Sequence, residues 1–577
     1  MSRKSVQFTS SPLLASKTPI WRSQFIVALI ALGFLGLIVR AAFVQVIEND
    51  FFKRQGVVRF VRTQDIPADR GKIFDRNGQI LASSVAVPSI FATPEDLDRD
   101  PAKMTQLAKL LEMTLPDLQN RTKDEDKGFV WLKRMVDEPL AEQIKALKIK
   151  GIGVRKEYKR IYPEGEAVAH VVGYTTIENN GQDGAELTFN TNLTGHKGSR
   201  RIIKNRFGEA VEDMGQTLAP VDGQDLQLSI DSKVQYFAYQ KLKDAVVGHK
   251  AIAGSIVVLD VNTGEVLALA NYPSFTPNSH TNLTGAQLRN RAITDTFEPG
   301  STMKPFVVGL ALEQGIVTPD TIIQTGGGKL AMGGFTIRDD SPNGAISVRQ
   351  VIQKSSNIGA VKISLQMPPQ QLWGMFTQVG FGQKPQVPFP GLVGGKLRSY
   401  KTWHPIEQAT MSYGYGLSVS LFQLAHAYTM FAREGEIIPL SLMKHEEHVA
   451  GVRVISKQHA DEVRQMLHMV AGPGGTAPKA QTMGYSVGGK TGTAHKVQGN
   501  GYSNKYRGFF VGMAPIENPR IIVAVMIDEP TDGFYFGGDV AAPVFSQTVQ
   551  QALRVMGIQP DMRVKPQVVA KAEPESF

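Results

Sequence analysis

The sequence predicts an α+β fold with one transmembrane helix near the N-terminus and two domains after it. Three observations support this prediction. One long apolar run lies close to the N-terminus, and the segment after it mixes short strand and helix patterns. In the C-terminal half, strand-like segments lie at both ends and apolar helical patterns lie between them. This order is typical of a single sheet whose edge is built late in the chain, with the helices grouped apart from it.

The N-terminal apolar run predicts an uncleaved membrane anchor. Phe25 to Val46 contains only Arg40 and Gln45 as strongly polar residues, and about 20 apolar residues span a bilayer core. The tail before it carries four basic and no acidic residues. The positive-inside rule therefore predicts a cytoplasmic tail over 1–24, a transmembrane helix over 25–47 and export of the rest. A cleaved signal peptide is the alternative, but no convincing small-x-small cleavage site follows the run.

Composition indicates a globular chain and excludes several classes of function. The 577 residues carry a formal net charge of +10 and no cysteine. Without cysteine there are no disulfides, thiolate metal sites or cysteine nucleophiles. The densest basic stretch, Lys197 to Arg206, has no interleaved aromatic residue. We interpret it as a solvated strand or linker and expect no nucleic acid partner.

Residues 48–220 are predicted to form a non-catalytic domain. Asn77-Gly78 indicates a hairpin turn between short strands, and helical patterns cover Pro101 to Leu111 and Glu138 to Leu147. The turn-rich segment Thr217 to Gln224 marks its end.

Residues 221–561 are predicted to form the catalytic domain, followed by a polar tail over 562–577 that we expect to be disordered. The pattern predicts strands and helices over the following segments: Asp225 to Ile230, Ile252 to Asp260, Glu265 to Ala270, Gly508 to Met513 and Ile521 to Ile527 as strands, and Ser232 to Val246 and Val544 to Met556 as helices.

Ser301 and Lys304 are the first candidate catalytic pair. Residues three apart share a helix face, so the amine lies within reach of the hydroxyl, and a serine can be activated without histidine. A second S-x-x-K, Ser441 to Lys444, runs into a charged segment and is assigned a surface role. The first copy leads into a buried helix, Phe306 to Leu312, which we expect to begin at Ser301 or Thr302 because Pro305 fits only a first turn.

Two further motifs complete the candidate site. Ser355 and Asn357 lie inside the helical pattern Val348 to Leu365, whereas the other Ser-x-Asn, Ser341 to Asn343, lies in a turn-rich loop. Lys490-Thr491-Gly492-Thr493 occurs once, in a strand-like setting. Each motif is weak alone, but their order along the chain is specific for penicillin-recognising serine enzymes.

With these motifs the sequence resembles the class B penicillin-binding proteins, which are peptidoglycan D,D-transpeptidases. Arg70-Gly71, Arg160 and Gly184 with Glu186 match the family's non-catalytic pedestal. The resemblance covers nearly everything after residue 60. It implies a penicillin-binding transpeptidase domain of serine β-lactamase-like fold, preceded by an elongated pedestal domain of the dimerisation type. The short tail and the segment Arg40 to Gln45 look most like the septal, cell-division member of Gram-negative bacteria, and the elongation-specific relative is the alternative.

The resemblance implies acyl transfer between cell-wall stem peptides. Ser301 would attack the D-Ala–D-Ala carbonyl, and an amine of a neighbouring stem peptide would resolve the acyl-enzyme. Lys304 is the expected base. It can act only when neutral, so burial and the nearby Lys490 are expected to lower its pKa from the ordinary value of ~10.4. Ser355 is expected to relay the proton to the leaving amine, and Asn357 to hold Lys304 and the substrate amide.

The strand edge is expected to bind the substrate. Lys490, Thr491, Gly492 and Thr493 would receive its terminal carboxylate, and the backbone N–H groups of Ser301 and Thr493 would form the oxyanion hole.

The resemblance also implies partners and a location. β-Lactams mimic D-Ala–D-Ala and should trap the acyl-enzyme, and a membrane-embedded glycan polymerase and other divisome proteins are expected partners. The catalytic domain is expected in the periplasm, anchored in the inner membrane. No cofactor is expected, and no metal, since His445-Glu-Glu-His448 lacks the spacing of a two-histidine zinc helix.

Specific features of the sequence disfavour other classes of protein. A β-lactamase needs a carboxylate that drives water onto the ester, and the nearest candidate after Ser355, Glu407, has the wrong setting. The pedestal and the anchor also disfavour a lactamase and a D,D-carboxypeptidase. A penicillin-binding sensor or a division scaffold is the alternative of a different class. A sensor would need an intracellular output module, for which a tail over 1–24 offers little room.

Overall fold

A computed structural model describes residues 19–51, 61–204, 210–279, 283–445, 449–499 and 501–562. Most of the predicted cytoplasmic tail and of the predicted disordered C-terminal tail lies outside these ranges. Helix α1 (Ile20–Ala42) continues through a π-helical turn (Phe43–Ile47). Within the described ranges, this is the one helix long and apolar enough to cross a membrane. It contains all of the predicted span over 25–47 and begins five residues earlier.

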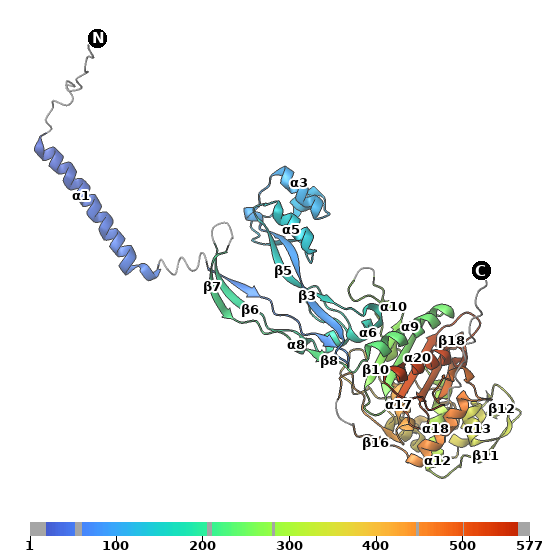
Figure 1. The fold of residues 1–577 in the computed structure, drawn as a ribbon. Coiled ribbons are helices and arrows are strands. Elements are labelled where there is room, and N and C mark those ends of the chain that lie inside the picture. Colours follow the sequence, from blue (N-terminus) through green and yellow to red (C-terminus); the bar gives the residue numbers. More distant parts are fainter. Residues whose placement is uncertain are drawn as a thin grey trace, which may run out of the picture.

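The pedestal has two arms that diverge from a common base (Figure 1). One arm is a three-stranded antiparallel sheet of order β1-β6-β7, and the other is built on β3 with β4 and β5 as antiparallel partners. The strands are β1 (Val61–Ile66), β2 (Ile73–Phe74), β3 (Ile80–Ala92), β4 (Val130–Lys133), β5 (Ile152–Ile161), β6 (Gly198–Lys204), β7 (Ala210–Leu218) and β8 (Leu226–Gln227).

The far end of the β3–β5 arm carries a small helical subdomain (Figure 1). Helices α3 (Pro101–Leu110), α4 (Leu115–Arg121) and α5 (Glu138–Ala146) enclose a separate apolar core that includes Leu107 and Leu118. Two of these helices were predicted, and each differs from the prediction by one residue at its C-terminal end. The Asn77-Gly78 turn is also confirmed, with Gly78 at φ +84° between β2 and β3.

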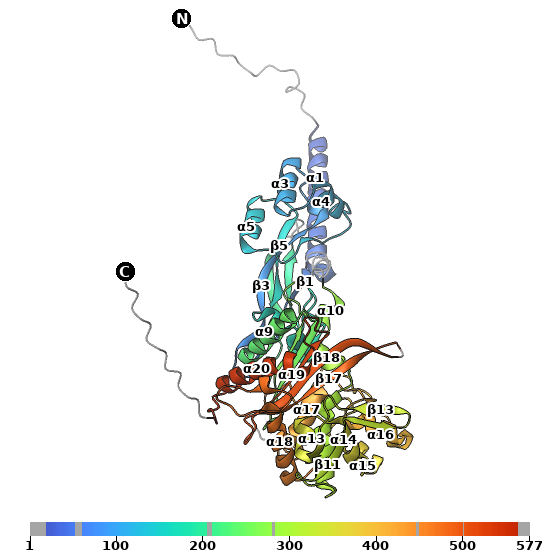
Figure 2. The same ribbon diagram turned by 90° about the vertical axis from the view of Figure 1, so that its right-hand side faces the viewer.

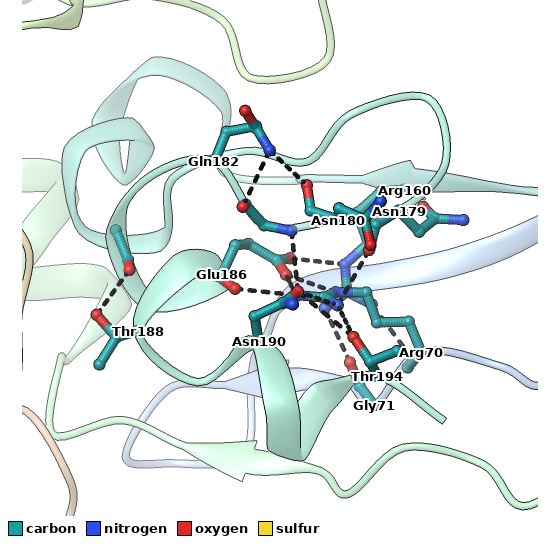
Figure 3. Close-up of polar contacts among 12 residues, drawn as sticks. Arg70, Gly71, Arg160, Asn179, Asn180, Gln182, Glu186, Thr188, Asn190 and Thr194 are labelled. Carbon is teal, nitrogen blue, oxygen red and sulfur yellow. Dashed lines mark hydrogen bonds and ion pairs between the residues drawn. The ribbon is translucent and has the colours of Figure 1, made fainter. Parts of the chain in front are cut away.

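A buried ion cluster fastens the base of the pedestal (Figure 3). Glu186, on α7 (Gly184–Thr188), is fully buried and accepts hydrogen bonds at 2.7 Å from Nε of Arg70 and Nε of Arg160. Arg160 also donates to the carbonyl oxygen of Gly71 at 2.8 Å. The carboxylate of Glu186 therefore links the segment before β2 to the C-terminal end of β5. This contact gives Arg70, Arg160 and Glu186 a structural role in the pedestal.

The catalytic domain is a five-stranded antiparallel sheet with helices on both faces (Figure 2). Its strand order is β10-β9-β19-β18-β17, so two early strands pair with three late ones, as predicted. Every residue of β9 and β19 is buried, which explains their unbroken apolar sequences. The strands are β9 (Ala253–Asp260), β10 (Val266–Tyr272), β17 (Gly488–Gln498), β18 (Gly501–Ala514) and β19 (Ile521–Asp528).

Two helix groups cover this sheet (Figure 2). Helices α9 (Ser232–Gly248) and α20 (Ala542–Val555) pack together on one face, and the helices between β10 and β17 in the chain pack on the other. The second group includes α12 (Lys304–Glu313), α13 (Val348–Gln353), α14 (Asn357–Ser364), α15 (Pro369–Gln378), α16 (Pro405–Ser412), α17 (Leu421–Ala432) and α18 (Lys457–Ala471).

The segment predicted as the first strand of the catalytic domain has a different place. Of Asp225 to Ile230, only the two residues of β8 form a strand, and β8 pairs in parallel with β2 of the pedestal. The pattern of alternation was correct, but the pairing partner lies about 150 residues earlier, and a local pattern cannot identify it.

The ion cluster gives a stability prediction. Glu186→Gln would leave two buried arginines without a full counter-charge, and breaking a buried pair costs about 3–5 kcal/mol. We expect urea unfolding of the detergent-solubilised chain to show a loss of this size. Glu178→Gln is the matched control, because the Glu178 side chain is 58% exposed in its pair with Arg134. Equal losses in the two variants would contradict this role of Glu186.

Candidate active site

Ser301 lies in a tight turn that opens helix α12. Gly300–Met303 is a 3₁₀ turn, and the α-helix follows from Lys304 with Pro305 in its first turn. The predicted position of Pro305 is confirmed, while the helix begins three residues later than Ser301. Gly414 supports this turn from the neighbouring loop: its carbonyl oxygen accepts a hydrogen bond from the N–H of Gly300 at 3.2 Å, and a Cβ there would lie 2.0 Å from the Gly300 carbonyl oxygen. Only glycine fits such a backbone contact.

The amine of Lys304 is buried beside the hydroxyl of Ser301. The Lys304 side chain is fully buried, and its Nζ lies 2.8 Å from Oγ of Ser301. It also lies 2.5 Å from the carbonyl oxygen and 3.1 Å from Oγ of Ser355. A neutral amine satisfies all three contacts, because its two N–H groups donate to Ser355 and its lone pair accepts from the Ser301 hydroxyl.

Burial lowers the pKa of Lys304 from 10.5 to about 7, and the negative charges of Asp339 and Asp340 partly oppose this shift. The sequence had predicted that Lys490 would help to lower it. This prediction is wrong for Lys490, because burial alone lowers the pKa of Lys304. The repulsion between the two amines acts on Lys490 instead, whose pKa is held well below its usual value by burial and then by Lys304.

Ser355 lies at a break between two helices, not inside one. The predicted helix from Val348 to Leu365 is interrupted after α13, and Ser355 adopts φ +60°. Ser356 then caps α14 by accepting a hydrogen bond from the N–H of Gly359 at 2.9 Å. The left-handed conformation costs roughly 1 kcal/mol in a residue other than glycine. It turns the Ser355 carbonyl toward Lys304, which a continuous helix would have bonded within itself.

Ser355 bridges the two buried amines. Its Oγ lies 3.1 Å from Nζ of Lys304 and 2.9 Å from Nζ of Lys490. A hydroxyl can accept from one amine and donate to the other, so this geometry suits the predicted relay of a proton.

Asn357 does not hold Lys304, contrary to the prediction. Its Nδ2 donates to the carbonyl oxygen of Arg338 at 2.8 Å, and its side chain lines the cleft. The left-handed turn at Ser355 is the reason, because it places the Ser355 carbonyl, and not the Asn357 amide, against the amine.

The Lys-Thr-Gly-Thr motif lies on β17, the edge strand of the sheet, as its sequence setting predicted. Lys490 is fully buried, whereas Thr491 and Thr493 line the cleft. Gly492 passes close to the serine turn, where a Cβ would lie 3.0 Å from the carbonyl oxygen of Pro299. A larger residue would push the strand away from the nucleophile.

The cleft over Ser301 has a volume of about 530 Å³. Five predicted site residues line it, while Lys304, Lys490 and Gly492 lie behind its surface. Sequence reasoning assigned no site role to several other lining residues: Asp340, Tyr415, Thr476, His495, Tyr506, Tyr535, Phe536 and Asp539. These residues carry no local signal, because segments distant in the sequence bring them to the cleft.

The competing motifs lie elsewhere. Oγ of Ser441 donates to the carbonyl oxygen of Met443 at 2.9 Å and belongs to a turn. Glu407 pairs with Arg398 at 2.7 Å and does not line the cleft. Of the His445 to His448 segment, residues 446–448 lie outside the described residues.

A serine turn packed under an edge strand, with a buried lysine amine as its neighbour, defines a serine acyltransferase of the penicillin-recognising class. Residues 254–550 match the family described as penicillin binding protein transpeptidase domain, and residues 65–228 match the penicillin-binding protein dimerisation domain. The chain belongs to the penicillin-binding proteins that carry both domains, and the family implies peptidoglycan as substrate and β-lactams as ligands.

Relatives extend over nearly the whole chain. The probable peptidoglycan D,D-transpeptidase PenA of Neisseria meningitidis is 41% identical over 544 residues, 93% of each chain. The peptidoglycan D,D-transpeptidase FtsI of Escherichia coli is 39% identical over 548 residues, 94% of this chain and 93% of that protein. The apo structure of the TP domain of Burkholderia pseudomallei penicillin-binding protein 3 is 53% identical with a TM-score of 0.55, covering 58% of this chain and 98% of that one.

The buried amine predicts how acylation depends on pH. Because the neutral form of Lys304 is the base, the rate of acylation by benzylpenicillin should rise with pH and reach half its plateau near pH 7. At pH 6 it should be about tenfold below the plateau. Stopped-flow measurement from pH 5 to 9 checks this. Lys444→Ala, in the other S-x-x-K, should keep the wild-type profile, and a flat wild-type profile would contradict the assignment.

Proposed function

We propose that this protein is a peptidoglycan D,D-transpeptidase that cross-links stem peptides of the septal cell wall during cell division. The observation that carries the proposal is the 2.8 Å contact between Oγ of Ser301 and the buried amine of Lys304. The end-to-end similarity to FtsI of E. coli supports the septal assignment over an elongation-specific role.

In the proposed acylation, Ser301 attacks the carbonyl carbon of the penultimate D-Ala while its proton passes to Lys304. The proton then moves through Oγ of Ser355 to the nitrogen of the departing terminal D-Ala. The backbone N–H groups of Ser301 and Thr493 are proposed to stabilise the oxyanion, which requires donors fixed before charge develops. The product is an ester on Ser301 and a free D-Ala.

The substrate carboxylate is proposed to bind along β17. The hydroxyls of Thr491 and Thr476 lie 2.8 Å apart, and Thr493 lies further along the same strand edge. Lys490 lies behind them, with its Nζ 3.2 Å from Oγ1 of Thr491. A bound carboxylate would favour the protonated form of Lys490 and raise its pKa again, so the substrate itself would complete the charge balance of the site.

The second half-reaction returns the enzyme to its first state. The amine of a neighbouring stem peptide attacks the ester carbonyl, Lys304 accepts the proton of that amine, and Ser301 leaves with a proton. β-Lactams present a strained amide in the same position and are proposed to stop after the first half-reaction.

The proposed location follows from the anchor. With the basic tail (1–24) in the cytoplasm and the helix (25–47) in the inner membrane, the pedestal (48–220) and the transpeptidase domain (221–561) lie in the periplasm, followed by the tail at 562–577. A membrane-embedded glycan polymerase and other divisome proteins are the proposed partners.

Removal of the Ser301 hydroxyl distinguishes a catalytic role of the protein from a scaffolding role. Ser301→Ala should abolish the covalent benzylpenicillin adduct detected by mass spectrometry, and it should fail to restore division in cells depleted of the wild-type protein. Ser441→Ala is the matched control and should behave as wild type in both assays. Rescue of division by Ser301→Ala would show that the essential role is scaffolding, contrary to the proposal.

A further inference from the structure

One carboxylate in the active-site cleft is not used by the chemistry described so far. Asp340 follows β13 (Phe335–Arg338) and lines the cleft together with Ser301, Ser355 and Asn357. Asp340 is exposed to solvent. Its charge acts on both buried amines, since it raises the pKa of Lys304 and of Lys490.

The two residues before Asp340 are fixed to the segment that follows the helix break at Ser355. Asn357 Nδ2 donates to the Arg338 carbonyl oxygen at 2.8 Å. The carboxylate of Asp339 accepts from the hydroxyl of Ser356 at 2.6 Å and from the N–H of Ile358 at 2.9 Å. Asp340 is therefore held on the same wall as the catalytic serines, although its own side chain is not engaged.

The other carboxylates near the cleft already have partners. Asp539 pairs with Lys479 at 2.7 Å. Glu298 accepts hydrogen bonds from the N–H of Gly416 at 2.8 Å and from the hydroxyl of Tyr502 at 3.0 Å. Across the described residues, Asp340 makes no hydrogen bond or ion pair. The Asp340 carboxylate is thus available to bind a ligand in the cleft over Ser301.

The cleft is consequently polarised. Its β17 side presents the hydroxyls of Thr476, Thr491 and Thr493 with Lys490 behind them, a set that suits an anion. The segment after β13 presents Asp340 to the same cleft, and this carboxylate suits a cation and would repel a carboxylate. A peptide with a terminal carboxylate is thereby directed to β17, and the Asp340 side is left for a positively charged group.

We propose that Asp340 binds the protonated amine of the acceptor stem peptide and holds it beside the acylated Ser301. This inference rests on the proposed transpeptidase function. A primary amine is an ammonium near neutral pH, so an acceptor arrives carrying a positive charge, and it arrives when the negative carboxylate of the donor's terminal D-Ala has left.

The protons of this step pass through Lys304, and one of them finally leaves to solvent. Lys304 is neutral again after acylation, because its proton has left with D-Ala. The ammonium held by Asp340 gives one proton to Lys304, directly or through Oγ of Ser355. The nitrogen then bonds to the acyl carbon, the bond from that carbon to Oγ of Ser301 breaks, and Ser301 recovers a proton from Lys304. The nitrogen also loses a second proton, which Lys304 takes up and then releases to solvent, so that Lys304 is neutral again for the next cycle.

The test compares Asp340→Asn with wild type in a two-substrate assay. A D-alanyl thioester serves as donor and a lysine-containing tripeptide as amine acceptor, and aminolysis and hydrolysis products are separated by chromatography. Asparagine keeps the size but not the charge, so the acceptor concentration for half-maximal aminolysis should rise about tenfold, the scale of one hydrogen bond to a charged group. Asp340→Glu should restore most of this loss.

Two controls test whether the effect of Asp340→Asn is specific to binding of the acceptor amine. Acylation by benzylpenicillin at pH 9, where Lys304 is neutral in both proteins, reports an intact site and should change less than twofold. Asp539→Asn removes a cleft carboxylate that Lys479 already neutralises, and it should leave the acceptor dependence within twofold of wild type.

Other outcomes overturn the inference. An unchanged acceptor dependence in Asp340→Asn would show that Asp340 does not bind the amine. A loss of hydrolysis with aminolysis intact would assign Asp340 to water activation. If wild type acylates but yields no aminolysis product at any acceptor concentration, the transpeptidase proposal itself fails, a result distinct from a defect confined to the variant.

Discussion

The active site depends on the removal of the Lys304 amine from water. Burial favours the neutral amine, and only the neutral amine has a lone pair that can accept the Ser301 proton at 2.8 Å. An exposed lysine at the same distance would be an ammonium near neutral pH and could not act as a base. The left-handed turn at Ser355 follows from this burial, because an amine without water still needs acceptors for its N–H groups, and that turn supplies a carbonyl oxygen at 2.5 Å.

The pedestal and the catalytic domain treat buried cations in opposite ways. In the pedestal, Arg70 and Arg160 share the carboxylate of Glu186, and arginine stays charged in such a place. In the active site, Lys304 and Lys490 are buried without a carboxylate in contact, and their pKa values fall. A guanidinium paired with a carboxylate stabilises the fold, whereas a buried lysine amine without a carboxylate partner is available for proton transfer.

The sequence predicts those parts of the molecule that local patterns determine. The apolar runs of β9 and β19 predicted buried strands, and Pro305 fixed the start of the serine helix to within three residues. It failed where tertiary contacts override a pattern. The helix break at Ser355 could not be predicted, because the residues around it have ordinary helical spacing and only the approach of Lys304 explains the turn. Asp340 had no signal, since the residues that share the cleft with it, such as Ser301, Thr491 and Tyr535, lie in segments far from it in the sequence.

The most direct test of this account is the protonation state of one side chain. With ¹⁵N-labelled lysine and Lys304→Arg to assign the signal, an NMR titration reads the pKa of the Lys304 amine in the resting enzyme. The account predicts a midpoint at about 7. A midpoint near the ordinary lysine value of ~10.4 would mean that the amine is charged when Ser301 attacks, and the proposed base would be wrong.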